Sequence, residues 1–106
     1  MVDVGKAVRM AVKTGKVVLG TKRTLQLIKQ GKVKLAIVAS NCPTEIREDL
    51  EYYCKLSNIP IYTYDGTSWD LGAVCGKPFM VAVMAIIDPG DSEILKLAKG
   101  GNHGNE

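Results

Sequence analysis

The segment Lys34-Leu35-Ala36-Ile37-Val38-Ala39 decides the fold. Its apolar residues follow one another without alternating with polar ones, which is the pattern of a strand covered on both faces by helices. A second continuous apolar run, residues 80–87, predicts another buried strand. Together the two runs predict the centre of a sheet that lies between layers of helices.

The segments around these runs alternate between helical and strand patterns. A last helix is expected to begin at Ser92, which gives the order α-β-α-β-α-β-α-β-α. This order predicts an α/β protein, a three-layer α/β/α sandwich with a four-stranded sheet, mixed or mostly parallel, joined by right-handed crossovers. The other helices are expected at residues 3–14, 21–30, 43–57 and 67–74, and the short strands at residues 16–19 and 59–63.

Length and composition indicate a single domain. The 106 residues, 46% of them apolar, are enough for one sizeable core. We expect residues 1–99 to form a single domain and residues 100–106, rich in glycine and asparagine, to form a disordered tail. No apolar run approaches the roughly 18 residues of a membrane span, and the N-terminus lacks a secretion pattern. A soluble protein that is not exported is expected.

The residues that could support catalysis or metal binding do not form a known arrangement. The three cysteines, Cys42, Cys54 and Cys75, lack the C-x-x-C spacing of zinc sites and are expected to be reduced and mostly buried. The only histidine, His103, lies in the expected tail, which removes most Ser-His, Cys-His and metal mechanisms. We expect no catalytic residue, no metal site and no cofactor.

Two further segments could suggest an active site, and both have a simpler interpretation. Residues 72–77 resemble a phosphate-binding loop, but the two glycines are one residue too close and Pro78 stands where serine or threonine is required. The carboxylates of residues 45–51 share one predicted helix with Arg47 and Lys55. We interpret them as a solvated helix face.

The charge is distributed unevenly along the chain. Residues 1–34 hold nine lysines and arginines and one acidic residue, a net charge of +8. Residues 35–106 hold five lysines and arginines and ten acidic residues, a net charge of −5. This polarity favours a basic surface that faces a polyanion such as a nucleic acid, although an ordinary solvated face would show it too.

The segment Gly20-Thr21-Lys22-Arg23-Thr24 predicts where such a polyanion binds. It places two cations and a hydroxyl group at the start of a helix, where free backbone N–H groups already favour anions. Gly20 has no side chain to obstruct a close approach, and Lys22 and Arg23 can reach phosphates or base edges. The alternative is an ordinary capped helix with exposed charges.

If the sheet is doubly wound, the loops after its strands lie together at one edge, so we expect Ser40-Asn41 and the Asp65-Gly66 region to lie close to this helix start. Asn41 follows the central strand and could read a base. Lys77 adds a cation, and Phe79, the only phenylalanine, could stack on an unpaired base. For Phe79 a place in the core is the alternative. The candidate RNA-binding residues are therefore Gly20, Thr21, Lys22, Arg23, Asn41, Lys77 and Phe79.

At these residues the sequence resembles the large-subunit ribosomal protein family L-thirty-e, within the superfamily that recognises kink-turn RNA. The resemblance implies an α/β/α sandwich that binds a kinked internal loop of RNA, without enzymatic activity. Family RNA contacts would fall on Gly20, Lys22, Arg23, Asn41 and Phe79. The segments that carry the resemblance are GTKRT (20–24), LAIVASN (35–41), LGAVCGKPF (71–79) and DPGDSEIL (88–95).

The resemblance also implies a cellular setting. It places the chain in the cytoplasmic large ribosomal subunit and implies rRNA and other ribosomal proteins as partners. The short chain and its moderately basic balance fit an archaeal member, with a bacterial paralogue as the alternative. The sequence itself predicts a monomer in isolation, because no long apolar heptad is apparent.

Two alternatives remain open. One is a guide-RNA particle core protein of the same fold, although Lys22-Arg23 stands where those proteins usually have an Asn-Glu pair, which favours the ribosomal branch. The other is a small-molecule-binding α/β domain that uses the same edge of the sheet.

Overall fold

A computed structural model describes residues 3–96 of the chain. The expected tail at residues 100–106 lies outside this range, as does the end of the helix expected to begin at Ser92. Between Asp91 and Leu95 the described chain forms turns and no helix.

Four helices alternate with four strands in the order expected for the described residues. The strands form one sheet in the order β1-β4-β2-β3. The helices are α1 (Val4–Thr14), α2 (Thr21–Lys29), α3 (Thr44–Leu56) and α4 (Ser68–Val74), and the strands are β1 (Lys16–Leu19), β2 (Leu35–Ala39), β3 (Ile61–Tyr64) and β4 (Val83–Asp88).

The sheet is mixed. Strands β2 and β3 are parallel, whereas β4 lies between β1 and β2 and is antiparallel to both. The mixed sheet is therefore confirmed and a mostly parallel one is not. Because β1 and β2 both oppose β4, they run in the same direction as β3. The carboxyl ends of these three strands and the start of β4 meet at one edge of the sheet.

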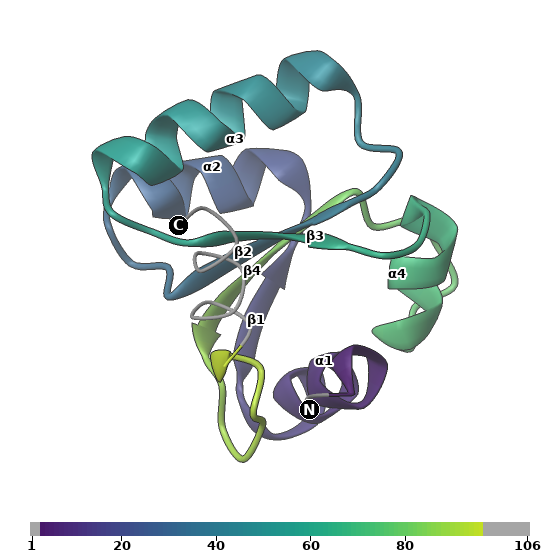
Figure 1. The fold of residues 1–106 in the computed structure, drawn as a ribbon. Coiled ribbons are helices and arrows are strands. Elements are labelled where there is room, and N and C mark those ends of the chain that lie inside the picture. The colour runs from purple at the N-terminus through teal and green to yellow at the C-terminus, as the bar shows by residue number, and fades with distance from the viewer. Residues whose placement is uncertain (1–2, 97–106) are drawn as a thin grey trace.

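The helices cover both faces of the sheet, as Figure 1 shows, with α1 and α4 on one face and α2 and α3 on the other. The protein has two hydrophobic cores, one on each face of the sheet, and alternate residues of the fully buried strand β2 pack into one core and then the other. Leu35 and Ile37 pack in the core beneath α1 and α4, and Ala36 and Val38 pack in the core beneath α2 and α3. The three-layer α/β/α sandwich is confirmed.

The apolar run before β4 differs from its prediction. The strand begins at Val83 and not at Met80. The Val81 N–H donates to the Ser68 carbonyl oxygen at 3.0 Å, and the Ala82 carbonyl oxygen accepts from the Ala39 N–H at 2.8 Å. This segment therefore connects α4 to the sheet, and it is apolar because it packs there.

Strand β3 also begins later than predicted. It starts at Ile61, whereas residues 59–63 were expected. The Ile59 N–H donates to the Cys54 carbonyl oxygen at 2.8 Å, so buried Ile59 belongs to the turn that ends α3. Its apolar character reflects burial in the core and not strand pairing.

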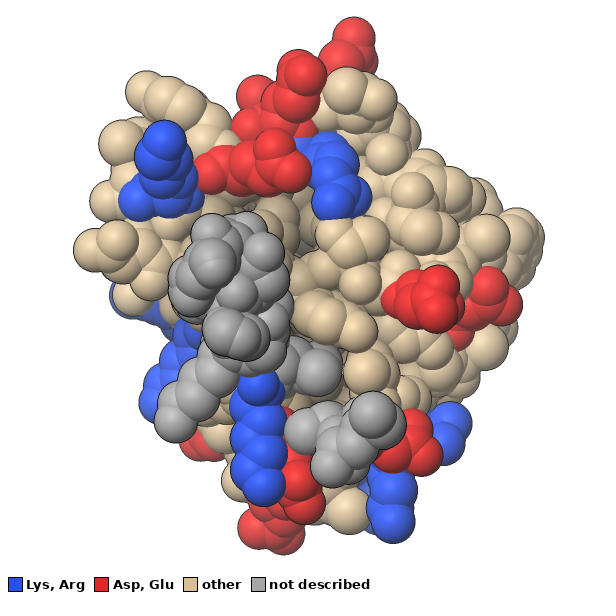
Figure 2. Space-filling view, viewed as in Figure 1, with Lys and Arg blue, Asp and Glu red and all other residues tan. Residues whose placement is uncertain are grey.

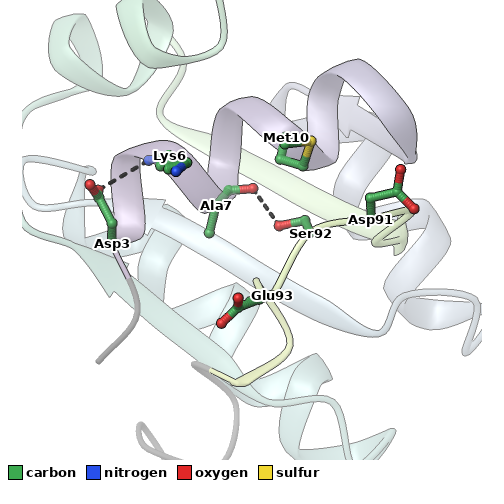
Figure 3. Close-up of a pocket in the computed structure, with 7 residues that line it drawn as sticks. All are labelled: Asp3, Lys6, Ala7, Met10, Asp91, Ser92 and Glu93. Atoms are coloured by element: carbon green, nitrogen blue, oxygen red, sulfur yellow. Dashed lines mark hydrogen bonds between the residues drawn. The ribbon is translucent and has the colours of Figure 1, made fainter.

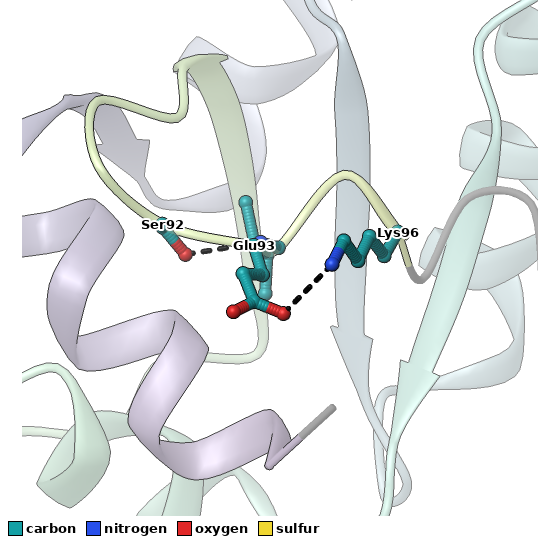
Figure 4. Close-up of polar contacts among 4 residues, drawn as sticks. Ser92, Glu93 and Lys96 are labelled. Carbon is teal, nitrogen blue, oxygen red and sulfur yellow. Dashed lines mark hydrogen bonds and ion pairs between the residues drawn. The ribbon is translucent and has the colours of Figure 1, made fainter. Parts of the chain in front are cut away.

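The chain after β4 is held against α1. The Ser92 hydroxyl donates to the Ala7 carbonyl oxygen and accepts from the Ile94 N–H. Figure 3 shows the pocket of about 230 Å³ between α1 and this segment. An ion pair of 3.0 Å joins Glu93 and Lys96 beyond it (Figure 4), and it lowers the pKa of the exposed Glu93 carboxyl. The pocket is lined by Asp3, Lys6, Ala7, Met10, Asp91, Ser92 and Glu93.

None of the helices within residues 3–96 combines the length and apolar character needed to cross a membrane.

Candidate nucleic-acid interface

A groove of about 500 Å³ opens at the edge of the sheet where β1, β2 and β3 end and β4 begins. Four separate segments build it, one from each loop at this edge. The loops that were expected to meet do so. The Ser40 hydroxyl and backbone N–H both donate to the Gly66 carbonyl oxygen, and Gly20 and Thr21 line the groove together with Asn41. The groove is lined by Leu19, Gly20, Thr21, Asn41, Pro43, Ile46, Ser68, Phe79, Met80, Val81 and Ala82.

Gly20 forms the wall of the groove at the start of α2. Its backbone has φ 116° and ψ 149°, a conformation that is essentially restricted to glycine. A Cβ atom placed on it would meet nothing within 4 Å. The backbone here is therefore open to a bound molecule, while the Gly20 N–H is used by the Val83 carbonyl oxygen at 2.9 Å.

Asn41 lies at the end of β2 and connects two walls of the groove. Its amide oxygen accepts from the Ser68 N–H at 2.8 Å, at the start of α4. The amide nitrogen has no hydrogen-bond partner among the residues that the structure describes, and the residue is exposed. Asn41 can therefore donate a hydrogen bond into the groove but has one acceptor lone pair already engaged.

The predicted cations lie beside the groove and not in it. Lys22 and Arg23 are exposed on the first turn of α2, directly after the lining residues Gly20 and Thr21. Lys77 is exposed in the loop after α4 and does not line the groove. The structure thus brings Gly20, Thr21, Asn41 and Phe79 together as lining residues, with Lys22 and Arg23 beside them.

Phe79 does not occupy the core, which was the alternative for this residue. It is 50% exposed and lines the groove next to Met80, which is 55% exposed. Trp69 is 62% exposed and follows the lining residue Ser68. Large apolar side chains therefore surround one rim of the groove.

Several residues at the groove were missed by reasoning from the sequence. Met80 and Val81 were assigned to a strand, and Trp69 was treated only as part of a helix start. Ile46 packs against the core beneath α2 and α3, but nothing in the sequence indicates that this end of α3 borders the groove.

The basic N-terminal third does not form one basic face. Its cations Lys6, Arg9 and Lys13 lie on α1, whereas Lys22 and Arg23 lie on α2, across the sheet. In Figure 2, lysines and arginines are dispersed over the visible face. The prediction of a single basic surface from this segment was wrong, because the first two helices pack on opposite sides of the sheet.

The three cysteines are not activated as nucleophiles. Cys42, Cys54 and Cys75 are buried, as predicted. Burial raises the pKa of Cys54 and of Cys75 to about 11, and burial also raises the pKa of Cys42. Such thiols stay protonated near neutral pH and are poor nucleophiles.

Comparison with known proteins agrees with the geometry of the fold. A solved structure of a protein with unknown function from Bacillus halodurans C superposes with a TM-score of 0.80 over 92% of this chain and 97% of that chain, at 21% identity. At this identity the likeness shows the fold alone.

Closer relatives cover nearly the whole chain. The large ribosomal subunit protein eL30 of Methanothermobacter thermautotrophicus is 57% identical over 95 residues, which are 90% of this chain and 97% of the relative. The proteins of the same name from Methanopyrus kandleri and Methanocaldococcus jannaschii are 55% and 54% identical, covering 90% and 92% of this chain and 87% and 88% of theirs. The model of the ribosomal protein L7Ae/L30e/S12e/Gadd45 family matches residues 3–96. The resemblance drawn from the sequence is confirmed, and the chain belongs to this family of ribosomal proteins.

Proposed function

We propose that this chain is a non-enzymatic structural protein of the large ribosomal subunit in the cytoplasm, and that its groove binds a kinked element of ribosomal RNA. The ribosomal role is supported by the relatives named large ribosomal subunit protein eL30, which are more than half identical to this chain over nine tenths of its length. The kinked RNA is the finer part of the proposal, and it depends on the groove.

The observation that carries the RNA site is the open backbone at Gly20. An RNA backbone can approach the start of α2 because no Cβ atom stands there and the space is empty. The positive end of the helix dipole attracts phosphate at this position. Lys22 and Arg23, exposed on the same turn, add two charges that contact phosphates or guanine edges.

The rim and floor of the groove suit an unstacked base. Sequence-specific RNA recognition relies on bases that are splayed out and stacked on aromatic side chains. Phe79 provides an exposed aromatic ring beside Met80, and the free amide nitrogen of Asn41 can donate to a base acceptor. A kinked internal loop supplies such a base next to closely spaced phosphates, whereas a regular duplex does not.

We propose that the isolated protein is a monomer. The proposal of RNA binding is tested by titrating this protein with a short kink-turn RNA and with an unbent duplex of equal length, at several salt concentrations. We expect selective binding of the kinked RNA. Lys22→Ala/Arg23→Ala should weaken RNA binding at fixed salt. It should also lower the slope of log affinity against log salt concentration by up to about two units, about one for each phosphate that the variant no longer neutralises.

Phe79→Ala should make the free energy of RNA binding less favourable by about 1–3 kcal/mol because the base has no ring on which to stack.

The matched control is Lys32→Ala/Lys34→Ala, which removes the same charge from exposed positions before β2, at the opposite edge of the sheet. Equal weakening by both double variants would leave only a general charge effect and would contradict the site. Equal affinity for the kinked and straight RNA would contradict the RNA class.

A further inference from the structure

Five large apolar side chains are exposed within the described residues, and they fall into two groups. Phe79 and Met80 line the groove, and Trp69 follows the lining residue Ser68. Tyr52 and Leu56, 59% and 65% exposed, lie on α3 instead. Ile46, where α3 borders the groove, is ten residues before Leu56, which corresponds to about 15 Å along the helix. The second group therefore needs a separate explanation.

Tyr52 and Leu56 are neighbours on the outer side of α3, because residues four apart lie on one face of a helix. The Tyr52 ring meets the Tyr53 ring edge to face, with centroids 5.1 Å apart. Tyr53 is half-buried and is itself held under the Lys29 ammonium group, 4.6 Å from the ring centroid. Tyr52 is thus supported on one side and presents its other side to solvent.

The same outer side of α3 is acidic. Glu45 and Asp49 continue the line of Tyr52 and Leu56 at helical spacing, with Glu48 beside them, and all three carboxylates are exposed. None of the three forms an ion pair with any residue between Asp3 and Lys96, whereas Glu51 pairs with Arg47 at 3.3 Å. Figure 2 shows acidic residues gathered over α3. We call the outer side formed by Glu45, Glu48, Asp49, Tyr52 and Leu56 the α3 surface.

We propose that the α3 surface is a docking site for a lysine- and arginine-rich segment of another protein that also carries an apolar anchor. Charge complementarity selects this partner, since free carboxylates attract cations and repel the phosphates of RNA or anionic lipids. The apolar pair supplies the desolvated centre that protein interfaces require, with an aromatic anchor and a charged rim. The apolar centre of this site, Tyr52 and Leu56, lies towards the end of α3 that is away from the RNA-binding groove.

The test uses a fluorescently labelled peptide in which lysine and leucine alternate, titrated with the full chain at low salt and followed by anisotropy. Tyr52→Ala/Leu56→Ala should weaken binding about tenfold through loss of the apolar centre. Glu45→Gln/Glu48→Gln/Asp49→Asn should weaken it by a similar factor and reduce its salt dependence. Because all five side chains are exposed, the variants should keep the circular dichroism spectrum of the parent.

Two matched controls make the result specific. Asp65→Asn/Asp91→Asn/Glu93→Gln removes the same charge from exposed positions away from α3, and Trp69→Ala/Met80→Ala removes comparable apolar surface at the groove. Both should leave peptide binding unchanged. If either control weakens binding as much as its α3 counterpart, the peptide senses only net charge or general apolarity and the proposal is overturned. Kink-turn RNA binding that is retained in the α3 variants would show that the two sites are distinct, and its loss in these variants would show that they are not. Failure of the parent chain to bind kinked RNA would contradict the groove proposal and leave the peptide result standing.

Discussion

Gly72 on α4 is required for the space it leaves. A Cβ atom at this position would lie 2.0 Å from the Phe79 carbonyl oxygen, so the backbone before β4 rests directly on the helix. Gly5 on α1 is also helical, yet a Cβ atom there would meet only the Asp3 carboxylate at 3.7 Å, an ordinary contact. The two glycines are alike in local structure and differ only in what packs against them.

We therefore expect opposite effects of alanine at these two positions. Gly72→Ala should lower the free energy of unfolding by about 2 kcal/mol, because backbone must shift to admit the methyl group. Gly5→Ala should raise it by up to about 1 kcal/mol through helix propensity. Urea unfolding measures both, and a neutral Gly72→Ala would contradict the close approach of Phe79.

Thr24 on α2 offers a stabilising change. Its side chain is fully buried, and its hydroxyl oxygen has no hydrogen-bond partner within the described part of the chain. Thr24→Val keeps the shape and removes the unsatisfied group, so we expect the free energy of unfolding to rise by about 1 kcal/mol. Thr24→Ser, which keeps the hydroxyl and deletes the methyl group, should be destabilising in the same urea titration. A loss of stability in Thr24→Val would indicate that the hydroxyl is satisfied.

At the scale of elements, the buried strand β2 was the most predictable part of the molecule. Its unbroken apolar run has one interpretation in an α/β chain, and it lies at Leu35–Ala39, within one residue of its prediction. The run before β4 shows the limit of such reasoning. Met80 and Val81 are as apolar as the strand, but they line the groove and lie against α4. An apolar run in the sequence does not show whether its residues pair with a neighbouring strand or only pack against other elements.

The same limit applies to the groove. Gly20, Thr21, Asn41 and Phe79 were expected there and line it, because strand ends in an α/β sheet carry loops to one edge. The hydrogen bond from the Ser68 N–H to the Asn41 amide oxygen depends on how the loops after β2 and β3 pack together. The place of Ile46 in the groove lining depends on how α3 packs beside these loops. Such contacts between distant segments have no local signature in a single sequence.

The start of α4 is set by a reciprocal cap whose loss should be measurable. The Thr67 hydroxyl accepts from the Asp70 N–H at 3.3 Å, and the Asp70 carboxylate accepts from the Thr67 N–H at 2.9 Å. Thr67→Ala should lower the free energy of unfolding by about 1 kcal/mol. Thr44→Ala is the control, since Thr44 is exposed at the start of α3 and should change little. Equal effects would show that the cap contributes nothing specific.

For the whole molecule, the two cores share one chemical feature. Cys75 lies in the core beneath α1 and α4, with its sulfur 3.8 Å from that of Met84, and Cys54 lies in the core beneath α2 and α3. Burial raises the pKa of each thiol from 9.0 to about 11. Each helix layer therefore covers a thiol that ionises only when the protein unfolds or at high pH.

This arrangement predicts a loss of stability in alkali. Between about pH 9 and about pH 11 the unfolded chain releases the two thiol protons while the folded chain retains them, so the free energy of unfolding falls as pH rises through this window. Below about pH 8 the effect should vanish. Urea unfolding of Cys54→Ala/Cys75→Ala at several pH values should show a smaller alkaline decline than the parent chain, and an identical decline would contradict the assignment.

The position of β4 governs when the sheet can form. This strand is the last of the four in sequence, yet within the described residues it is the only neighbour of β1 and one of the two neighbours of β2. A nascent chain that has not yet exposed residues 83–88 leaves β1 with no partner, and β2 can pair only with β3. Because domains form once their long-range pairings are available, assembly of the sheet waits until residues 83–88 have been synthesised. The first three strands emerge with open edges that must be kept apart from those of other chains.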